Sequence, residues 1–385
     1  MHAYPSGRRV ETSRAWTAVR RFGGPVADDL FLVSRPAEGP ADAARQAEAV
    51  YEAILDALAA EDAGPEAIVG ETVFLRGIRD HLPAVRSVRS AMLAATATTF
   101  IGQAPLAKDA LLEVAVAAVL PRRSSAHDVS RPGACATVVR LGDETSLHAG
   151  NVHGSGPDAF AEAYDMFRVA GDVVAEAGMQ FTDVVRTWIH VRDIGRDYDA
   201  LNRARRQFFR DRGIERLPAS TGVQGIPPSD AHAFSMSLHA IASPRPLAIT
   251  PMSAPSMNEA WSYGADFSRG LRVAGANGVT LHVSGTASID EAGRTAHVGD
   301  FPAQVDRMLQ NIGSLLERQG ATFADVVSGV TYVRDADDAP ALRSILRARG
   351  LDGFPCALVE TPLCRREMLC EAEVVAMLPA ASATA

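Results

Sequence analysis

The sequence predicts an α+β fold of three repeated units, each a mixed β-sheet with its helices on one face. Three observations lead to this prediction. A helix followed by a strand motif occurs three times, segments rich in Pro, Ser and Arg separate the copies, and landmark residues recur at one fixed offset. The chain has 385 residues, 47% of them hydrophobic and 22% charged, which is enough for two or three such units.

The repeated motif is most evident in GMQFTDVVRTWIHVRD from Gly178 and GATFADVVSGVTYVRD from Gly320, with AGPEAIVGETVFLRGI from Ala63 as a weaker copy. Each copy follows an amphipathic segment with apolar residues at i, i+3, i+4 and i+7, which indicates a helix. The three helices are predicted around residues 41–60, 158–177 and 301–318.

Each copy also ends in a strand of alternating polarity, and these strands begin near Leu111, Ala233 and Met368. Arg76 and Arg334 lie 258 residues apart, as do Glu113 and Glu371. Because two separate pairs of equivalent residues have the same spacing, true repetition is favoured over chance similarity. The predicted units are strand, helix, strand, helix, strand.

The motifs divide the chain into an N-terminal tail and three repeats joined by linkers. The tail is residues 1–26, and the repeats are residues 27–122, 133–244 and 256–380. The linkers are residues 121–132 and 244–255. The last repeat is the predicted catalytic one.

Composition excludes several functional classes. A formal net charge of −8 and a pI near 5.7 argue against nucleic-acid binding. No apolar run reaches the length of a membrane span, and the N-terminus lacks the apolar core of a secretory signal. The four cysteines fit no zinc pattern and are expected to be reduced thiols in a cytoplasmic protein.

The last alternating strand carries the first candidate for chemistry. Glu371 and Glu373 are two residues apart, so both side chains lie on one face of the strand. Two neighbouring carboxylates repel, and at least one should have a raised pKa. A carboxylic acid that stays protonated near neutral pH is a good general acid. Two harmless glutamates on a solvated edge strand would give the same pattern.

Two further residues have both a structural and a functional interpretation. Cys364 lies seven residues before Glu371 and next to Arg365, which would lower its pKa, although a lone cysteine more often serves packing. Gly285 either satisfies a backbone conformation or leaves space where a methyl group would stand.

The repeated unit resembles the RidA/YjgF fold, which is chorismate mutase-like and usually forms trimers. Three such units in one chain therefore resemble a covalent pseudo-trimer. Within that superfamily several strings resemble chorismatases: RTW at residues 186–188, PASTGVQG at 218–225, YGADFSR at 263–269, VSGTASID at 283–290 and CRREMLCEAE at 364–373. The additional N-terminal copy is longer than the resemblance leads us to expect.

The resemblance implies an enzyme that converts chorismate into 3-hydroxybenzoate and pyruvate. Glu371 corresponds to its catalytic acid. Cys364 and Gly285 match the branch that forms 3-hydroxybenzoate, with Cys364 assisting proton movement. Chorismate carries two carboxylates, which need cationic partners. The residues expected to bind the substrate are Arg186, Tyr263, Arg269 and Arg365.

The cluster Arg203, Arg205 and Arg206 is a weaker source of cations, because in NRARRQFF these residues look like the exposed side of a helix. No metal and no organic cofactor are expected, nor a nucleic-acid or membrane partner. The chain is expected to be a monomer with pseudo-trimeric repeats or a homo-oligomer.

Other functions remain open from the sequence. The nearest ones keep chorismate and change the product, by hydrolysis to a dihydroxycyclohexadiene carboxylate or elimination to 4-hydroxybenzoate. A RidA-like enamine or imine deaminase is a second alternative, although the stretch after Pro355 reads CALVE and lacks the arginine that this activity uses. A non-catalytic binding module is a third.

Overall fold

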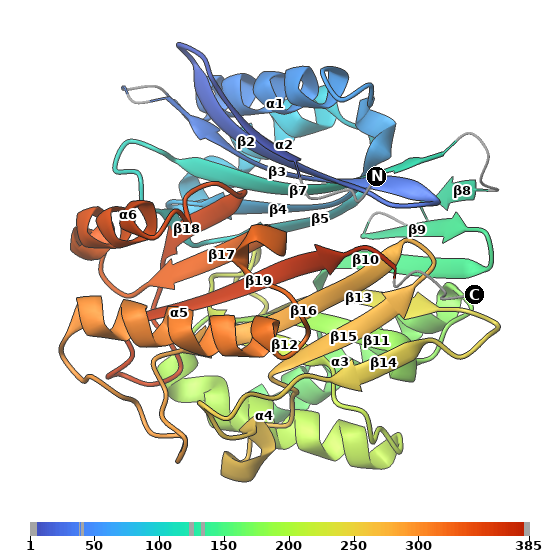
Figure 1. The fold of residues 1–385 in the computed structure, drawn as a ribbon, viewed down its shortest axis with the longest axis vertical. Coiled ribbons are helices and arrows are strands. Elements are labelled where there is room, and N and C mark those ends of the chain that lie inside the picture. The colour runs from blue at the N-terminus through green and yellow to red at the C-terminus, as the bar shows by residue number, and fades with distance from the viewer. Residues whose placement is uncertain (1–5, 38, 40–41, 123–126, 132–134, 381–385) are drawn as a thin grey trace.

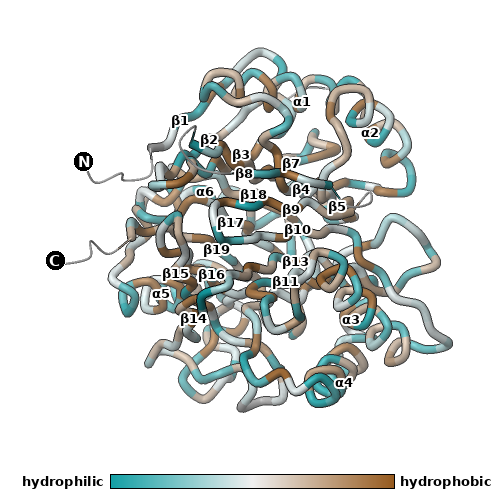
Figure 2. The backbone as a smooth tube through the Cα atoms, turned by 90° about the vertical axis from the view of Figure 1, so that its right-hand side faces the viewer, coloured by the Kyte–Doolittle hydropathy of each residue, from teal (hydrophilic) through white to brown (hydrophobic). Residues whose placement is uncertain are grey.

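The computed structural model describes residues 6–37, 39, 42–122, 127–131 and 135–380. Three mixed sheets face one another in the interior, and helices cover their outer faces (Figures 1 and 2). Each sheet with its helices forms one unit, which we call the N-terminal, middle and C-terminal units. The α+β prediction with helices on one face of each sheet is therefore confirmed.

The N-terminal unit is a six-stranded sheet with strand order β1-β2-β3-β7-β4-β5. Its strands are β1 (Ser6–Glu11), β2 (Ala15–Gly23), β3 (Ala27–Pro36), β4 (Ile68–Leu75), β5 (Ala97–Ile101) and β7 (Leu112–Pro121). Its helices are α1 (Ala43–Ala59) and α2 (Ile78–Met92).

The middle unit has strand order β12-β11-β13-β10-β9-β8. Its strands are β8 (His127–Ser130), β9 (Ala136–Leu141), β10 (Glu144–Val152), β11 (Val184–Val191), β12 (Ala219–Gln224) and β13 (Phe234–Ala242). Its helices are α3 (Ala159–Glu176) and α4 (Ile194–Asp211).

The C-terminal unit has strand order β14-β15-β16-β19-β17-β18-β6. Its own strands are β14 (Ala248–Pro251), β15 (Gly270–Gly275), β16 (Gly278–Ala287), β17 (Val326–Val333), β18 (Cys356–Glu360) and β19 (Cys370–Leu378). Its helices are α5 (Phe301–Glu317) and α6 (Ala339–Ala348). The short β6 (Ala104–Pro105) comes from the N-terminal unit and pairs with β18, so the two units share a sheet edge.

The three long helices begin in the same way. Asp42, Asp158 and Asp300 are the N-caps of α1, α3 and α5, and each side chain accepts a hydrogen bond from a backbone N–H three residues later. Each helix then buries an apolar face against its own sheet, which gives every unit a separate hydrophobic core. The predicted helix ranges are confirmed to within two residues.

The predicted tail and linkers are wrong in part, because they contain strands. In the predicted tail, residues 6–23 form β1 and β2, which pair antiparallel and extend the first sheet, while residues 1–5 lie outside the described residues. The linkers contain β8 and β14, which are edge strands of the next sheets, although residues 123–126 and residue 132 are also outside the described part. The edge strands β1, β8 and β14 are short and lack the apolar alternation that marks a core strand, so the sequence pattern missed them; β2 is longer and lies between β1 and β3.

No described helix is both long and apolar enough to cross a membrane.

Candidate active site

A cavity of about 290 Å³ lies between the middle and C-terminal units, and we call it the interface cavity. The middle unit contributes residues of α4 and β12, and the C-terminal unit contributes β16, β19 and the loops around residues 264–269 and 364–368. Its lining includes Tyr198, Asn202, Arg205, Ser220, Gly222, Phe267, Arg269, Gly285, Cys364, Arg365 and Glu371.

Hydrogen bonds across the two sheets hold the walls of this cavity together. The Ser220 backbone N–H donates to Ser284 Oγ at 2.9 Å, and the Gly285 N–H donates to Thr221 Oγ1 at 2.9 Å. Both bonds join β12 of one unit to β16 of the other, so the cavity forms only when the two units pack together.

Glu371 is the buried carboxyl group of the interface cavity. It lies on β19, paired with Ala287 of β16 and Tyr332 of β17, and is 5% exposed. Burial raises the pKa of Glu371 to about 8, and the nearby Glu373 adds to the rise, while the arginines around the site partly oppose it. At neutral pH this carboxyl is therefore mainly protonated.

Glu373 shares the strand face with Glu371, as predicted from alternation, but has different neighbours. Its carboxylate accepts a hydrogen bond from Arg186 Nη2 at 2.6 Å and another from Trp188 Nε1 at 2.6 Å. Arg186 is 1% exposed and also donates to Thr221 Oγ1. One glutamate of the pair is thus in a buried ion pair and the other faces the interface cavity.

This arrangement places Arg186 away from the predicted substrate contacts. It does not line the interface cavity but a second cavity on the other side of the ion pair. Sequence reasoning could not see this, because the partner Glu373 lies 187 residues away in the chain.

Three other arginines do line the interface cavity. Arg269 is 2% exposed and donates from Nε to the Asn258 carbonyl oxygen at 2.8 Å, and Arg365 donates from Nη1 to the Gly293 carbonyl oxygen at 2.7 Å. Both were predicted for the site. Arg205 of α4 is the third, and it is 4% exposed and lies over the Phe267 ring.

The interpretation of Arg205 as a surface residue is wrong. Leu201, Ala204, Arg205 and Phe208 follow one another at i, i+3, i+4 and i+7 and all are buried, so Arg205 belongs to the packed face of α4. That spacing was visible in the sequence and could have identified it. Arg203 pairs with Asp199, and Arg206 pairs with Asp266.

Cys364 lines the interface cavity, but its chemistry differs from the prediction. Burial raises the pKa of the Cys364 thiol to about 12, and Glu371 adds to the rise. Arg365 and a hydrogen bond with Tyr198 lower the pKa by less than burial raises it. Arg365 therefore lowers the pKa of Cys364 as expected, but burial outweighs it and the thiol is protonated at neutral pH.

Gly285 leaves the space that the Glu371 carboxyl occupies. A Cβ atom at this position would lie 2.0 Å from Glu371 Oε1 and 3.1 Å from Thr221 Cγ2. Gly285 is not among the glycines with positive φ, so backbone conformation does not require glycine here. Of the two interpretations of this glycine, the steric one applies.

Tyr263 is the last residue of a short 3₁₀ helix, Ala260–Tyr263, next to Gly264 of the cavity lining. Its side chain lies outside the described part of the structure, and its predicted role remains a prediction.

The N-terminal unit contains residues at positions equivalent to those of this site. Gln46 donates a hydrogen bond to the Asp109 carbonyl oxygen and accepts one from the Leu111 N–H. Gln304, 258 residues later, makes the same two hydrogen bonds with Glu367 and Leu369, just before the last strand. By this offset Leu106 takes the place of Cys364, and it is buried in the core of the C-terminal unit. The counterpart carboxyl, Glu113, lines neither described cavity. Of these two equivalent glutamates, Glu371 lines the interface cavity and Glu113 lines neither of the two cavities.

Among the described residues, no cluster of three or more His, Cys, Asp or Glu is arranged to hold a metal ion.

Comparison with known proteins shows which families and proteins the chain is similar to. Residues 259–378 match the family model described as endoribonuclease L-PSP. Over 223 residues the chain is 28% identical to a 3-hydroxybenzoate synthase of Streptomyces hygroscopicus, and the match covers 51% of this chain and 64% of that protein, a little less than two thirds of its length. A RutC family protein of Pyrococcus abyssi is 28% identical over 97 residues, which are 25% of this chain and 76% of that one.

A solved structure of a chorismatase matches with a TM-score of 0.62 and 20% identity, covering 81% of this chain and 93% of that chain. This likeness confirms the α+β fold over the part of the chain that it covers. The chain is therefore similar in sequence, over about half of its length, to a 3-hydroxybenzoate synthase, similar over residues 259–378 to the L-PSP family, and similar in fold to a chorismatase.

Proposed function

We propose that this protein is a chorismatase that converts chorismate into 3-hydroxybenzoate and pyruvate, with Glu371 as the general acid. The observation that carries the proposal is the buried Glu371 carboxyl, whose pKa is raised to about 8, in a cavity that three arginines line. The relative named 3-hydroxybenzoate synthase supports the choice of substrate and product.

The arginines match the charge of the substrate. Chorismate has two carboxylates, one on the ring and one on the enolpyruvyl group, and guanidinium groups bind carboxylates through paired hydrogen bonds. Arg205, Arg269 and Arg365 come from three different segments of the cavity wall. They can therefore hold the two carboxylates apart and fix the substrate relative to Glu371.

The first chemical step is a proton transfer. Protonated Glu371 delivers its proton to the methylene carbon of the enolpyruvyl ether, which gives the ether carbon oxocarbenium character and makes pyruvate a good leaving group. The Glu371 carboxylate that remains is then stabilised by the arginines that lower its pKa, Arg269 before Arg186 and Arg365.

The second step determines which product is formed. The hydroxyl group on ring carbon C4 gives its proton to the Glu371 carboxylate as its oxygen attacks C3, and the C3–O bond to pyruvate breaks, so no water enters the reaction. Opening of the resulting three-membered ring and loss of a ring proton give the aromatic 3-hydroxybenzoate. A protonated Cys364 thiol donates a hydrogen bond in this step, and its proton can exchange with the released one.

The proposal is tested by incubating the purified protein with chorismate alone and measuring products by chromatography with mass detection. We expect pyruvate and 3-hydroxybenzoate in equal amounts, and a loss of turnover of about 10²–10⁴-fold in Glu371→Gln. The matched control is Glu113→Gln, because Glu113 is a buried glutamate at the same position of the N-terminal unit, with a pKa raised to about 7 by burial. This control should keep the activity.

Other outcomes separate the alternatives. Formation of pyruvate with a dihydroxycyclohexadiene carboxylate or with 4-hydroxybenzoate would support chorismate as the substrate and refute 3-hydroxybenzoate as the product. No pyruvate, together with release of ammonia from imines, would indicate the deaminase activity. Saturable binding of chorismate without turnover would indicate a binding module.

A further inference from the structure

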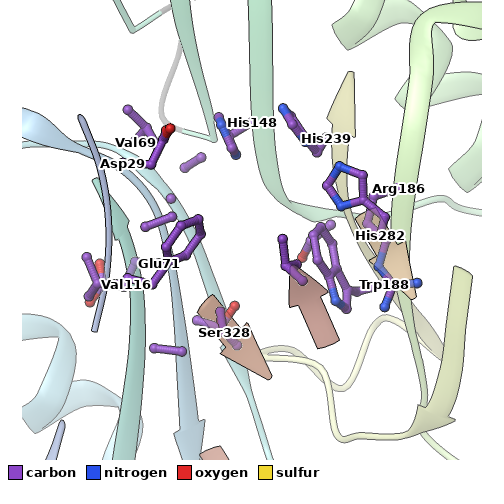
Figure 3. Close-up of a pocket in the computed structure, with 18 of the residues that line it drawn as sticks. Asp29, Val69, Glu71, Val116, His148, Arg186, Trp188, His239, His282 and Ser328 are labelled. Atoms are coloured by element: carbon purple, nitrogen blue, oxygen red, sulfur yellow. The ribbon is translucent and has the colours of Figure 1, made fainter. Parts of the chain in front are cut away.

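A second cavity of about 280 Å³ lies at the centre of the molecule, between the inner faces of the three sheets, and we call it the central cavity. All three units line it (Figure 3). Asp29, Val69 and Glu71 of the N-terminal unit lie on one side, and Arg186, Trp188 and His239 of the middle unit lie on the other together with His282 of the C-terminal unit. The proposed reaction makes no use of this cavity.

One wall of the central cavity is a group of imidazole rings. His148 and His239 stack with ring centroids 4.4 Å apart and an interplanar angle of 10°, and His282 meets His239 edge-on at 5.5 Å. Burial lowers the pKa of His148 to about 4 and that of His282 to about 3, so these rings are neutral at pH 7.

Several polar atoms on this wall have unused hydrogen-bonding capacity. Arg186 Nη1, His190 Nδ1 and His282 Nδ1 are buried and have no hydrogen-bond partner among the described residues. The residues that carry them are 1%, 3% and 4% exposed. Buried polar groups of this kind are nearly always satisfied in folded proteins, so an occupant with a polar atom is expected here.

Two of the charges that line the cavity are balanced by ion pairs. Arg186 is paired with Glu373, and Glu71 is paired with Arg89. Burial raises the pKa of Asp29 to about 7, which favours its neutral form over a third buried charge. Burial also raises the pKa of Glu144, so neither unpaired carboxyl of the lining offers a full counter-charge to a cation. An anion would find Arg186 already paired, and burying it would be costly. The occupant should therefore be neutral.

The volume of the central cavity and its remaining lining residues narrow the class of ligand further. A volume of about 280 Å³ is at the lower end of ligand pockets, which suits a molecule with a single ring. The walls away from the histidines carry aliphatic side chains, among them Val69, Ala117 and Val330. Flat imidazole and indole faces opposite aliphatic groups favour an aromatic ring.

We propose that the central cavity is a binding site for a neutral, single-ring phenolic compound. Its hydroxyl group contacts the unpartnered polar atoms of this wall, which are Arg186 Nη1, His190 Nδ1 and His282 Nδ1. Its ring packs between the histidine wall and the aliphatic wall. This site is separate from the interface cavity, and its occupancy does not depend on the proposed reaction.

The test is a titration of the protein, labelled with ¹⁵N in its histidine side chains, with phenol at pH 7.5, followed by NMR. No described histidine lines the interface cavity, so shifts of the His148, His239 and His282 signals report on the central cavity. We expect saturable shifts with phenol and at least tenfold weaker effects with benzoate, which is charged at this pH.

Two cavity-filling variants localise the effect. Ala117→Phe fills the central cavity from the N-terminal unit, and Val330→Phe fills it from the C-terminal unit. Either variant should abolish the shifts of the histidine signals. If Ala117→Phe does not fold, Val330→Phe provides the test. Gly222→Ala is the matched control, because its added methyl narrows the interface cavity, where it would lie 3.3 Å from the Tyr198 ring. It should leave the shifts unchanged.

Absence of saturable shifts with phenol in the folded wild-type protein would overturn the proposal. So would benzoate binding at these histidines as strongly as phenol, or shifts that persist in a folded cavity-filling variant.

Discussion

Substitution of Gly285 by alanine tests whether the position of the Glu371 carboxyl controls the reaction. The new Cβ would lie 2.0 Å from Glu371 Oε1, whereas real Cβ contacts are essentially never shorter than 3.0 Å. The carboxyl must therefore move by at least about 1 Å, since the alternative is a shift of two paired strands, β16 and β19.

The expected magnitude follows from this displacement. A misplacement of about 1 Å of a reacting group can lower the rate by about 100-fold, which corresponds to about 2.7 kcal/mol of activation free energy. The fold should tolerate the change, because the atom in conflict is the end of a side chain. The remaining product should shift from 3-hydroxybenzoate towards the hydrolysis product, because the methyl group alters where the ring and water can lie.

The assay is a measurement of kcat and of the product ratio for Gly285→Ala, with the Tm as a check on folding. The control is Gly222→Ala, whose methyl group would enter the same cavity next to Tyr198 and away from Glu371. A folded Gly285→Ala protein with the rate and products of the wild type would refute the reasoning, since Glu371 would then not need its observed position.

Three further predictions follow from buried charges. Because Glu371 must be protonated to act as the acid, kcat/KM should fall as the pH rises through about 8, and a pH–rate profile that increases above pH 8 would contradict this role. The buried histidines of the central cavity have pKa values below the ordinary 6.5, so the unfolded chain takes up protons first as the pH falls. These residues are His148, His190 and His282. The buried carboxyls Asp29, Glu113 and Glu371, with pKa values raised to about 7 or 8, oppose this effect, so the histidine contribution is measured by urea unfolding of the wild type against His148→Asn. The free energy of unfolding of the wild type relative to this variant should decrease between pH 6.5 and pH 4, at up to about 1.4 kcal/mol per pH unit, and a difference that does not change with pH would count against a neutral His148. Finally, Arg186→Met leaves Glu373 as an unpaired buried charge and should lower the free energy of unfolding by about 3–5 kcal/mol, whereas a raised KM at unchanged stability would restore the substrate-binding role for Arg186.

Much of the architecture could be predicted because its signals are local. The amphipathic periods of α1, α3 and α5, with an aspartate cap before each, depend on residues within one or two turns of helix. The offset of 258 residues between Glu113 and Glu371 is likewise a property of the chain. Edge strands β1, β8 and β14 were missed, since their stability comes from pairing with a neighbouring strand.

The candidate site was predictable only in part. Glu371, Gly285, Cys364, Arg269 and Arg365 were identified from the sequence, and the structure brings them into one cavity. Arg186 was assigned to the same site but faces the central cavity, and Arg205 was assigned to the surface but lines the interface cavity. Both differences arise from contacts between units, which a single strand or helix pattern does not contain.

The sequence by itself determined that the chain repeats and that Glu371 and Glu373 share one face of the last strand, because side-chain direction alternates along any strand. Only the tertiary structure decided that these two carboxyls behave differently. Arg186 and Trp188 of the middle unit compensate the charge of Glu373, while the packing of α4 and β12 removes water from Glu371. The free energy of a buried charge depends on its distant neighbours in the chain, and these are known only once the units are packed.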